Sequence, residues 1–185
     1  LFPDINAPGG STIATQLEKY RHSREGRTTG IRDKLEQMTS ASLRAYMFGR
    51  ETYKTRKLIT LSYINSIPLA ALRGYGEVNG LGDGLWAWYG LDFDSVNQRL
   101  RKLGYLRPSD DPTPYAEAYK QALSLFIAHR RPSFYLIAGL QELNQLTNSH
   151  LDLLAKDGVI SPKLRDAAKG MPLTLRRAAP KTRAV

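Results

Sequence analysis

A chain of 185 residues, 42% of them hydrophobic, is long enough for one domain with a hydrophobic core and short for two. Its formal net charge of +10 predicts an anionic partner, such as nucleic acid, an anionic membrane surface or a phosphate-bearing substrate. No apolar run approaches the roughly 18 residues of a membrane span, and the absence of cysteine excludes disulfides without fixing the compartment.

The first expected element is a helix over residues 11–20, which two glycines precede. Ser11 or Thr12 can cap it by accepting hydrogen bonds from its first free amides. Thr12, Gln16 and Lys19 recur at helical spacing on one face, beside an apolar stripe on another. Glycines before a helix start and a lysine two turns later suit a phosphate or pyrophosphate, because the helix dipole and the ammonium group attract the same anion.

Two more helices are expected in the first half of the chain. A polar connector over residues 21–30 leads into a helix whose apolar spacing runs from residue 31 to Gly49. The third helix, about residues 52–67, is apolar on most sides, so we expect it to be the central buried element. Its Asn65 would then be a buried polar group that needs hydrogen-bond partners.

The glycine-rich stretch of residues 73–90 holds four aromatic residues among six glycines. It does not fit a dinucleotide-binding G-x-G-x-x-G motif, because Asn79 stands where the third glycine belongs and no strand is expected before it. We therefore predict a loop that packs its aromatic side chains against the body.

Three helices are predicted in the second half, over residues 113–130, 140–158 and 161–170. Proline at a first helical position and glycine just after a last one mark their ends. The basic tail, residues 171–185, has no periodicity and reads as a linker. Few segments alternate with period two, so the pattern predicts an all-α fold.

Several motifs resemble, in order, those of the peptidoglycan glycosyltransferases, the lipid II polymerases found alone or fused to penicillin-binding transpeptidase domains. Residues 9–19, GGSTIATQLEK, resemble the family's Gly-Gly/Ala-Ser-Thr-Ile-x-x-Gln-Leu-x-Lys motif. Residues 32–36 resemble its Arg-Lys-x-x-Glu motif, and residues 54–65 resemble its Lys-x-x-Ile-Leu-x-x-Tyr-Leu-Asn helix. Residues 84–90 are similar to a Gly-Ile-x-x-Ala-x-x-Tyr-Phe-Gly segment, and residues 128–135 stand where the family has a Pro-Ser-x-Tyr turn.

The resemblance implies an all-α, lysozyme-like fold, present in part. Residues 1–170 would form the glycosyltransferase domain without its N-terminal motif, and residues 171–185 a basic tail or linker. The chain opens at Leu1 with no methionine and no charged leader, so we expect a piece of a longer protein. An anchoring segment would lie outside these residues.

The resemblance also implies a bacterial enzyme of cell-wall synthesis that works at the outer, periplasmic face of the cytoplasmic membrane. It would join lipid II to a growing glycan strand by an inverting displacement of undecaprenyl pyrophosphate. A divalent cation, Mg²⁺ or Mn²⁺, can accompany the diphosphate. Expected partners are lipid II, the glycan strand, the anionic membrane surface and other cell-wall synthesis proteins, and not nucleic acid.

The site residues are carried over from the matching motifs. Glu36 is the expected catalytic acidic residue, near the departing pyrophosphate or its cation, although an exposed carboxylate paired with Arg32 at i, i+4 is the plain alternative. Asn65 is assigned to structural support. The expected substrate-binding residues are Ser11, Thr12, Gln16, Lys19, Arg27 and Arg32. No histidine has metal-ligand spacing, so no protein metal site is predicted.

Two departures from the family pattern favour a different class of function. The family's Glu-Asp-x-x-Phe-x-x-His motif supplies the catalytic base before the Gly-Gly-Ser-Thr segment, but residues 1–8 contain no glutamate. Residues 146–151 stand where the family has an Arg-Arg-x-x-Val-Leu stretch and contain no arginine. The alternative is therefore a non-catalytic module of the same fold that binds anionic lipid, glycan or a cell-wall partner. A nucleic-acid binder has only its charge in support, because the arginines are dispersed and the aromatic residues cluster elsewhere.

Overall fold

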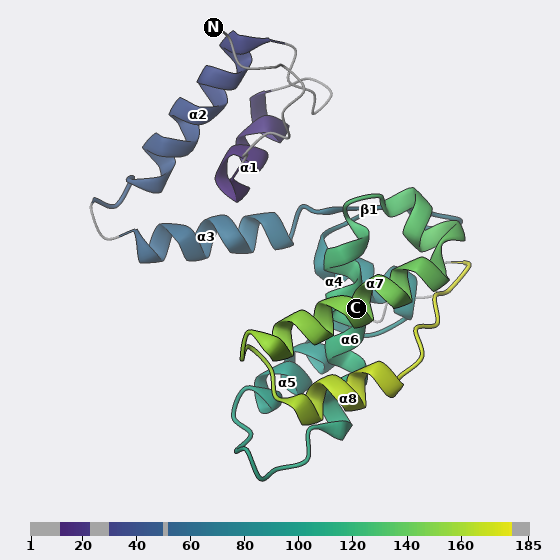
Figure 1. The fold of residues 1–185 in the computed structure, drawn as a ribbon. Coiled ribbons are helices and arrows are strands. Elements are labelled where there is room, and N and C mark those ends of the chain that lie inside the picture. Colours follow the sequence, from purple (N-terminus) through teal and green to yellow (C-terminus); the bar gives the residue numbers. More distant parts are fainter. Residues whose placement is uncertain (1–11, 23–29, 50–51, 179–185) are drawn as a thin grey trace, which may run out of the picture. The chain divides into compact units, whose positions relative to one another are not determined.

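The structure, a computed structural model, describes residues 12–22, 30–49 and 52–178, with the side chains of residues 19–22 excepted. These residues belong to two compact units, Leu1–Ile64 and Asn65–Val185, which we treat one at a time (Figure 1). Both are mostly helical, so the predicted all-α, lysozyme-like class is confirmed. The domain boundary at residue 170 stays a prediction. None of the described helices is both long and apolar enough to cross a membrane.

The first unit contains three described helices, α1 (Ile13–His22), α2 (Ile31–Ala45) and α3 (Tyr53–Ile64). The hydroxyl oxygen of Thr12 accepts the amide hydrogen of Thr15 at 3.3 Å, which confirms one of the two predicted N-caps of α1. Helices α1 and α2 pack side by side (Figure 1). Gln37 and Ala41, one turn apart, are the buried residues of α2. Gly49, with φ +88°, follows the end of α2 where the sequence predicts a helix stop.

The prediction that the third helix is the central buried element is wrong. Helix α3 buries only Thr55 and Ile59, whereas Leu58 and Leu61 are 51% and 56% exposed. Its first two turns carry Lys54, Arg56 and Lys57, whose charges need solvent, so the helix cannot be enclosed on all sides. Asn65, which follows its last turn, is exposed and is not the buried polar group that the sequence predicts.

The second unit begins with a small hairpin and continues with helices. Its elements are β1 (Pro68–Leu72), β2 (Gly76–Asn79), α4 (Gly80–Gly84), η1 (Leu85–Tyr89), α5 (Phe93–Leu103), α6 (Thr113–Ala128), η2 (Phe134–Ala138), α7 (Leu140–Lys156) and α8 (Pro162–Gly170). The segments η1 and η2 are single π-helical turns. Helices α6, α7 and α8 lie where the sequence predicts them, and Ser161 caps α8 by accepting the amide hydrogen of Leu164 at 3.1 Å.

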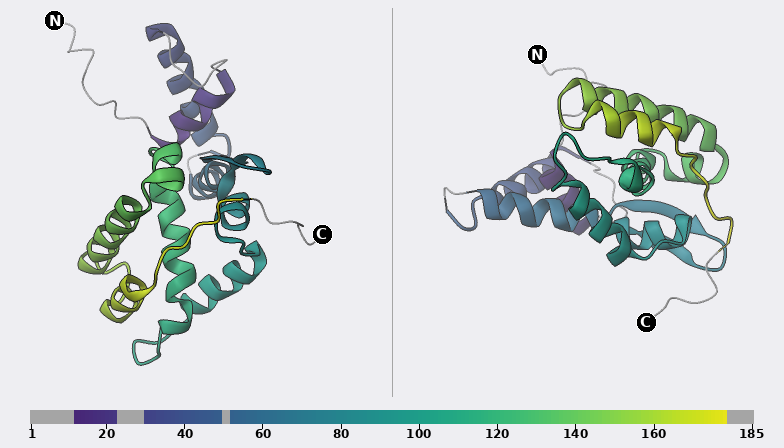
Figure 2. Two further views of the ribbon diagram at one scale, coloured as in Figure 1. Left: turned by 90° about the vertical axis from the view of Figure 1, so that its right-hand side faces the viewer. Right: turned by 90° about the horizontal axis from the view of Figure 1, so that it is seen from below.

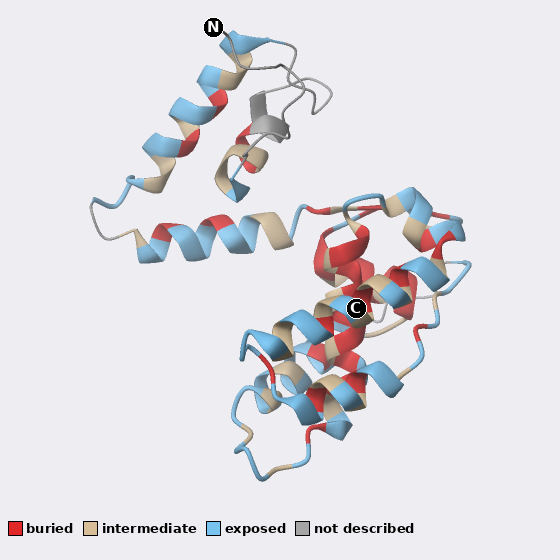
Figure 3. Cartoon of the chain, in the orientation of Figure 1, coloured by how far each residue is buried: buried red, intermediate tan, exposed pale blue. Residues whose placement is uncertain are grey.

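Helix α6 is the centre of the second unit. Figure 2 shows α5 on one side of it and α7 with α8 on the other, and each of these helices contacts it. Nine of its residues are buried, and Figure 3 shows the buried positions gathered along α6, α4 and η1. One cluster of the core joins α6 to the last two helices through Ala116, Leu151, Ile160, Leu164 and Ala168. Helix α6 carries alanine and leucine around most of its surface, so neighbouring helices can enclose it. The charged first turns of α3 prevent this.

Residues 73–90, predicted as a loop, instead form the second strand of a hairpin and two short helical turns. β1 and β2 pair antiparallel, with a register shift between Pro68 and Ala71, and the chain then turns into α4 and η1. The expected packing of aromatic side chains does occur, since Trp88 and Tyr89 are buried. The indole nitrogen of Trp88 donates to the carbonyl oxygen of Leu69 at 2.8 Å, which ties η1 to the hairpin.

The start of the C-terminal tail packs against this same turn. Residues 172–178 form no helix or strand, as the sequence predicts. Leu173 is nevertheless buried, and the amide of Arg176 donates to the carbonyl oxygen of Trp88 at 2.7 Å. This part of the tail is therefore held against η1.

Candidate functional site

The structure brings Arg32 and Glu36 together on the first half of α2. The guanidinium Nε of Arg32 lies 3.3 Å from the carboxylate Oε1 of Glu36, and the two side chains are 91% and 56% exposed. Spacing of one helical turn places them on one face, so the contact needs no tertiary support. The plain alternative of an exposed ion pair predicts the same contact, so the catalytic role of Glu36 stays a prediction.

The N-terminal end of α1 carries the other part of the candidate site. Thr12 is exposed, and its hydroxyl is engaged as the N-cap of the helix. Gln16 is partly buried one turn further on, and its amide donates the first helical hydrogen bond to the carbonyl of Thr12 at 3.0 Å. A helix start leaves amide hydrogens without an intrahelical acceptor, and these point at whatever lies before the helix. Ser11, Arg27 and the side chain of Lys19 lie outside the described residues.

A partly buried ion pair joins the two helices of the candidate site. The carboxylate Oε1 of Glu18 lies 2.7 Å from the guanidinium Nε of Arg44, with side-chain exposures of 1% and 40%. Sequence reasoning missed this pair. The available signal was Glu18 itself, an acidic residue directly after Leu17, which belongs to the apolar stripe of α1. Because Glu18 lies two residues after Gln16, the pair positions the α1 part of the site on α2.

Asn65, assigned from the sequence to structural support, belongs to the second unit and not to the first. Its backbone carbonyl is closely covered, since a Cβ added to Gly80 would lie 2.6 Å from this oxygen. Gly80 has a φ of +84°, which also favours glycine there. The close approach involves the backbone of Asn65, and the supporting role of its side chain remains a prediction.

The side chains that could coordinate a divalent cation limit how such an ion could bind. No group of three histidine, aspartate or glutamate side chains within the described stretches could hold a metal ion. Magnesium is often bound through one or two carboxylates, water and the phosphate oxygens of a substrate. Glu36, which is exposed, fits the role of a single carboxylate in such a shared site and does not fit a cage built by protein alone.

Comparison with known proteins gives one match. A family model described as transglycosylase matches residues 4–150. No curated protein and no solved structure matches the chain. The matched residues include the candidate site on α1 and α2 and extend through most of the second unit to α7.

Proposed function

The chain belongs to the transglycosylase family of peptidoglycan glycosyltransferases, and on this premise we propose that the intact protein polymerises lipid II into glycan strands. The reaction is an inverting displacement at the sugar carbon that carries undecaprenyl pyrophosphate. A base takes the proton from the acceptor 4-hydroxyl, the new glycosidic bond forms, and the diphosphate leaves from the opposite face. The family match over most of the chain is the observation that carries this proposal.

The leaving diphosphate requires positive charge on the donor side. Lys19 and Arg32 supply it in this proposal, and the N-terminal end of α1 adds the positive end of its helix dipole. Preorganised charges of this kind act most strongly where negative charge develops in the transition state. The exposure of Arg32 supports the role, because most of its donors are open to a ligand.

The remaining motif residues line the donor pocket in this proposal. Ser11, Thr12 and Gln16 offer hydrogen bonds from the start of α1, and Arg27 adds a cation from the connector. Glu36 is the acidic residue beside the diphosphate. A divalent cation shared by Glu36 and the phosphate oxygens would neutralise the charge that develops on the leaving group. Without such a cation, Glu36 orients Arg32 through their contact.

The surface of the first unit supports a location at a membrane. Tyr46, Met47 and Phe48, which follow α2 directly, are 62%, 58% and 56% exposed. Lys54 and Arg56 lie in the first turns of the following helix. Apolar side chains next to cations suit the interface of an anionic bilayer. We therefore propose that the protein acts at the outer face of the bacterial cytoplasmic membrane.

A non-catalytic module of the same fold is the second candidate. It is favoured by residues 146–151 in α7, which contain no arginine where the family has two. In this case the basic surface would bind anionic lipid, glycan or a cell-wall protein without turnover.

The test compares binding and turnover with labelled lipid II and the phosphoglycolipid inhibitor moenomycin. Glu36→Gln keeps the shape of the side chain and removes its charge, so we expect intact fold and a fall in polymer yield of about 10²-fold or more. Glu142→Gln on α7 is the control, because it removes an exposed carboxylate that is not part of the candidate site. Lys19→Ala should lower kcat more than donor affinity. Failure of the intact protein to bind either ligand saturably would overturn the assignment.

A further inference from the structure

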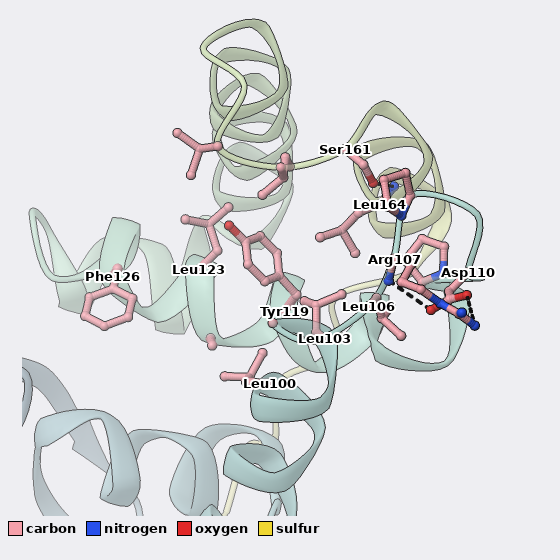
Figure 4. Close-up of a pocket in the computed structure, with 16 residues that line it drawn as sticks. Leu100, Leu103, Leu106, Arg107, Asp110, Tyr119, Leu123, Phe126, Ser161 and Leu164 are labelled. Atoms are coloured by element: carbon pink, nitrogen blue, oxygen red, sulfur yellow. Dashed lines mark hydrogen bonds and ion pairs between the residues drawn. The ribbon is translucent and has the colours of Figure 1, made fainter.

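The second unit holds a cavity of about 630 Å³ that the proposed function does not use. It lies between the end of α5, the following segment of residues 104–112, one face of α6 and the start of α8 (Figure 4). Its volume falls within the range of ordinary small-molecule sites. A hollow of this shape suits a small ligand better than a protein surface, which needs a broad contact area.

The walls of this cavity are apolar. Figure 4 shows Tyr119 in the middle, with Leu103 and Leu123 close to its ring and Leu164 on the facing helix. The phenol of Tyr119 is only partly enclosed, and burial raises the pKa of this group. The interior therefore favours a hydrocarbon body.

The rim of the cavity offers positive charge. Arg107 lines it, and Lys163 reaches the lining residue Pro108 by a 3.4 Å contact from its ammonium to the backbone carbonyl. Arg107 lies 3.5 Å from Asp110 through one terminal nitrogen, with a side chain that is 82% exposed, so its other donors face solvent. Each cation thus keeps hydrogen-bond donors for an anion.

Asp110 at the rim and the neighbouring Asp111 are both engaged in local turns. Asp110 accepts the amide hydrogen of Arg107 at 2.9 Å, and Asp111 accepts both the amide and the hydroxyl of Thr113, at 3.0 and 2.7 Å. These bonds, with nearby Lys163, hold the pKa of both carboxyl groups below the ordinary value. Both carboxylates accept hydrogen bonds from the protein, Asp110 on both oxygens and Asp111 on Oδ1, whereas the exposed Arg107 and Lys163 keep donors for a ligand. Charge complementarity therefore favours an anionic head group over a cationic one.

We propose that this cavity binds an amphiphile with one hydrocarbon chain and an anionic head group. The chain lies among Leu103, Tyr119 and Leu123, and the head lies at the rim against Arg107 and Lys163. Straight acyl chains and isoprenoid chains share this chemistry. The site belongs to the second unit, whereas the proposed donor residues of α1 and α2 belong to the first, so the inference stands apart from the proposed polymerase activity.

Titration calorimetry of the full chain with monomeric ligands tests the proposal. Decyl phosphate should bind saturably at one site, while decanol and decyltrimethylammonium should bind at least about tenfold more weakly. In the series octyl, decyl and dodecyl phosphate, each methylene should tighten binding about fourfold until the cavity is full. Geranyl phosphate, whose branched hydrocarbon group also has ten carbons, distinguishes the sources, because the hydrocarbon type that binds more tightly identifies an acyl or an isoprenoid ligand.

Variants locate the site. Arg107→Gln with Lys163→Gln should weaken decyl phosphate about tenfold or more. Arg99→Gln, an exposed cation on α5 that does not line the cavity, should leave binding unchanged. Val159→Asp places a negative charge on a lining residue that is 65% exposed, so it should weaken binding without loss of fold.

Three outcomes would overturn the proposal. Equal affinity for decanol and decyl phosphate would show that the anionic head group contributes nothing to binding. Binding that survives Val159→Asp at wild-type strength would place the ligand elsewhere. An absence of saturable binding by every phosphate would leave the cavity as a receptor for an apolar side chain of a partner protein.

Discussion

The ammonium group of Lys120 donates a hydrogen bond to the carbonyl oxygen of Met171, 2.6 Å away, and the lysine is only 1% exposed. A second contact, of 3.4 Å, reaches the carbonyl of Lys169. Both carbonyls lie at the C-terminal end of α8, where a helix has acceptors without intrahelical donors and the negative end of its dipole. Lys120 therefore fastens the end of α8 to the central helix α6.

Replacement of Lys120 by methionine should destabilise the second unit. Methionine keeps an apolar stem of similar length and removes the donor, so the carbonyl of Met171 loses its hydrogen bond. We expect the free energy of unfolding to fall by about 1–3 kcal/mol, measured by urea denaturation with circular dichroism. Lys156→Met, an exposed lysine in the last turn of α7, is the control and should change stability by less than about 0.5 kcal/mol. Equal effects of the two changes would contradict this role.

The same lysine should produce a pH dependence of stability. Burial lowers the pKa of Lys120 in the folded state, while in the unfolded chain it stays near the ordinary value of about 10.4. Between these two pKa values the unfolded state binds more protons, so the free energy of unfolding rises with pH. Tyr89 acts in the opposite sense above about pH 10, because burial raises its pKa well above the usual range.

Subtracting the free energy of unfolding of Lys120→Met from that of the wild type at each pH gives the contribution of Lys120. The stability that the lysine contributes should increase as the pH rises through the folded pKa towards about 10.4. Urea titrations at successive alkaline pH values measure this difference. A flat difference would show that the ammonium group is no harder to charge in the folded state than in the unfolded one.

Gly90, which ends η1, should not tolerate a side chain. Its φ is +70°, and a Cβ there would overlap the guanidinium group of Arg176 from the tail. The left-handed conformation alone costs an alanine about 1–2 kcal/mol. The guanidinium is the far end of a flexible side chain and can move aside, so we expect Gly90→Ala to lower the free energy of unfolding by about this amount. Gly170→Ala is the control, because nothing lies within 4 Å of an added Cβ. It should be neutral or stabilising by up to about 1 kcal/mol.

The helices that could be predicted carry their own boundary signals. Ser161 before a proline marks the start of α8, and Gly158, with φ +72°, follows the end of α7. The hairpin carries no such signal, because β1 begins with Pro68, does not alternate and shifts register before Ala71. Its pairing depends on contacts between strands, which a local pattern cannot report. Helix α5 was missed although Asp92 caps it by accepting the amide hydrogen of Ser95 at 2.9 Å.

In the candidate site, too, contacts within one helix could be predicted and contacts between helices could not. The contact of Arg32 with Glu36 could be predicted because it depends on helical spacing alone. The pair of Glu18 and Arg44 could not, because it forms only when the packed faces of α1 and α2 are known. The burial of α3 was overestimated for the same reason: apolar composition shows that a helix can be covered, and only the neighbouring elements show whether it is.

Breaking the partly buried pair of Glu18 and Arg44 should destabilise the first unit. Glu18→Gln leaves Arg44 without its charged partner, and we expect a loss of about 1–3 kcal/mol in the free energy of unfolding. Arg44→Gln should cost a similar amount. In the double variant the losses should be less than additive, because either single change already removes the interaction between the two groups. Thermal unfolding of the four proteins gives the coupling energy, and strictly additive losses would show that the two groups do not interact.

The chain of residues 1–185 should bind donor-like ligands without making polymer. The motif residues proposed for the donor side, Ser11, Gln16, Lys19, Arg32 and Glu36, are all present, so a diphosphate or moenomycin can still be bound. The resemblance places the general base on a glutamate before the Gly-Gly-Ser-Thr motif, and residues 1–8 contain none. Loss of a positioned base lowers rates by about 10²–10⁴-fold.

The measurement is the formation of glycan chains from labelled lipid II, together with moenomycin affinity, for residues 1–185 and for a form in which the family's Glu-Asp-x-x-Phe-x-x-His motif precedes them. We expect similar affinity and at least about 10²-fold more polymer from the longer form, because the base acts only on the acceptor hydroxyl. Glu36→Gln in the longer form tests the donor side separately from the base, since it should remove activity although the base is present. Polymer made by residues 1–185 would place the base within them, and the donor-side assignment of Glu36 would then have to be revised.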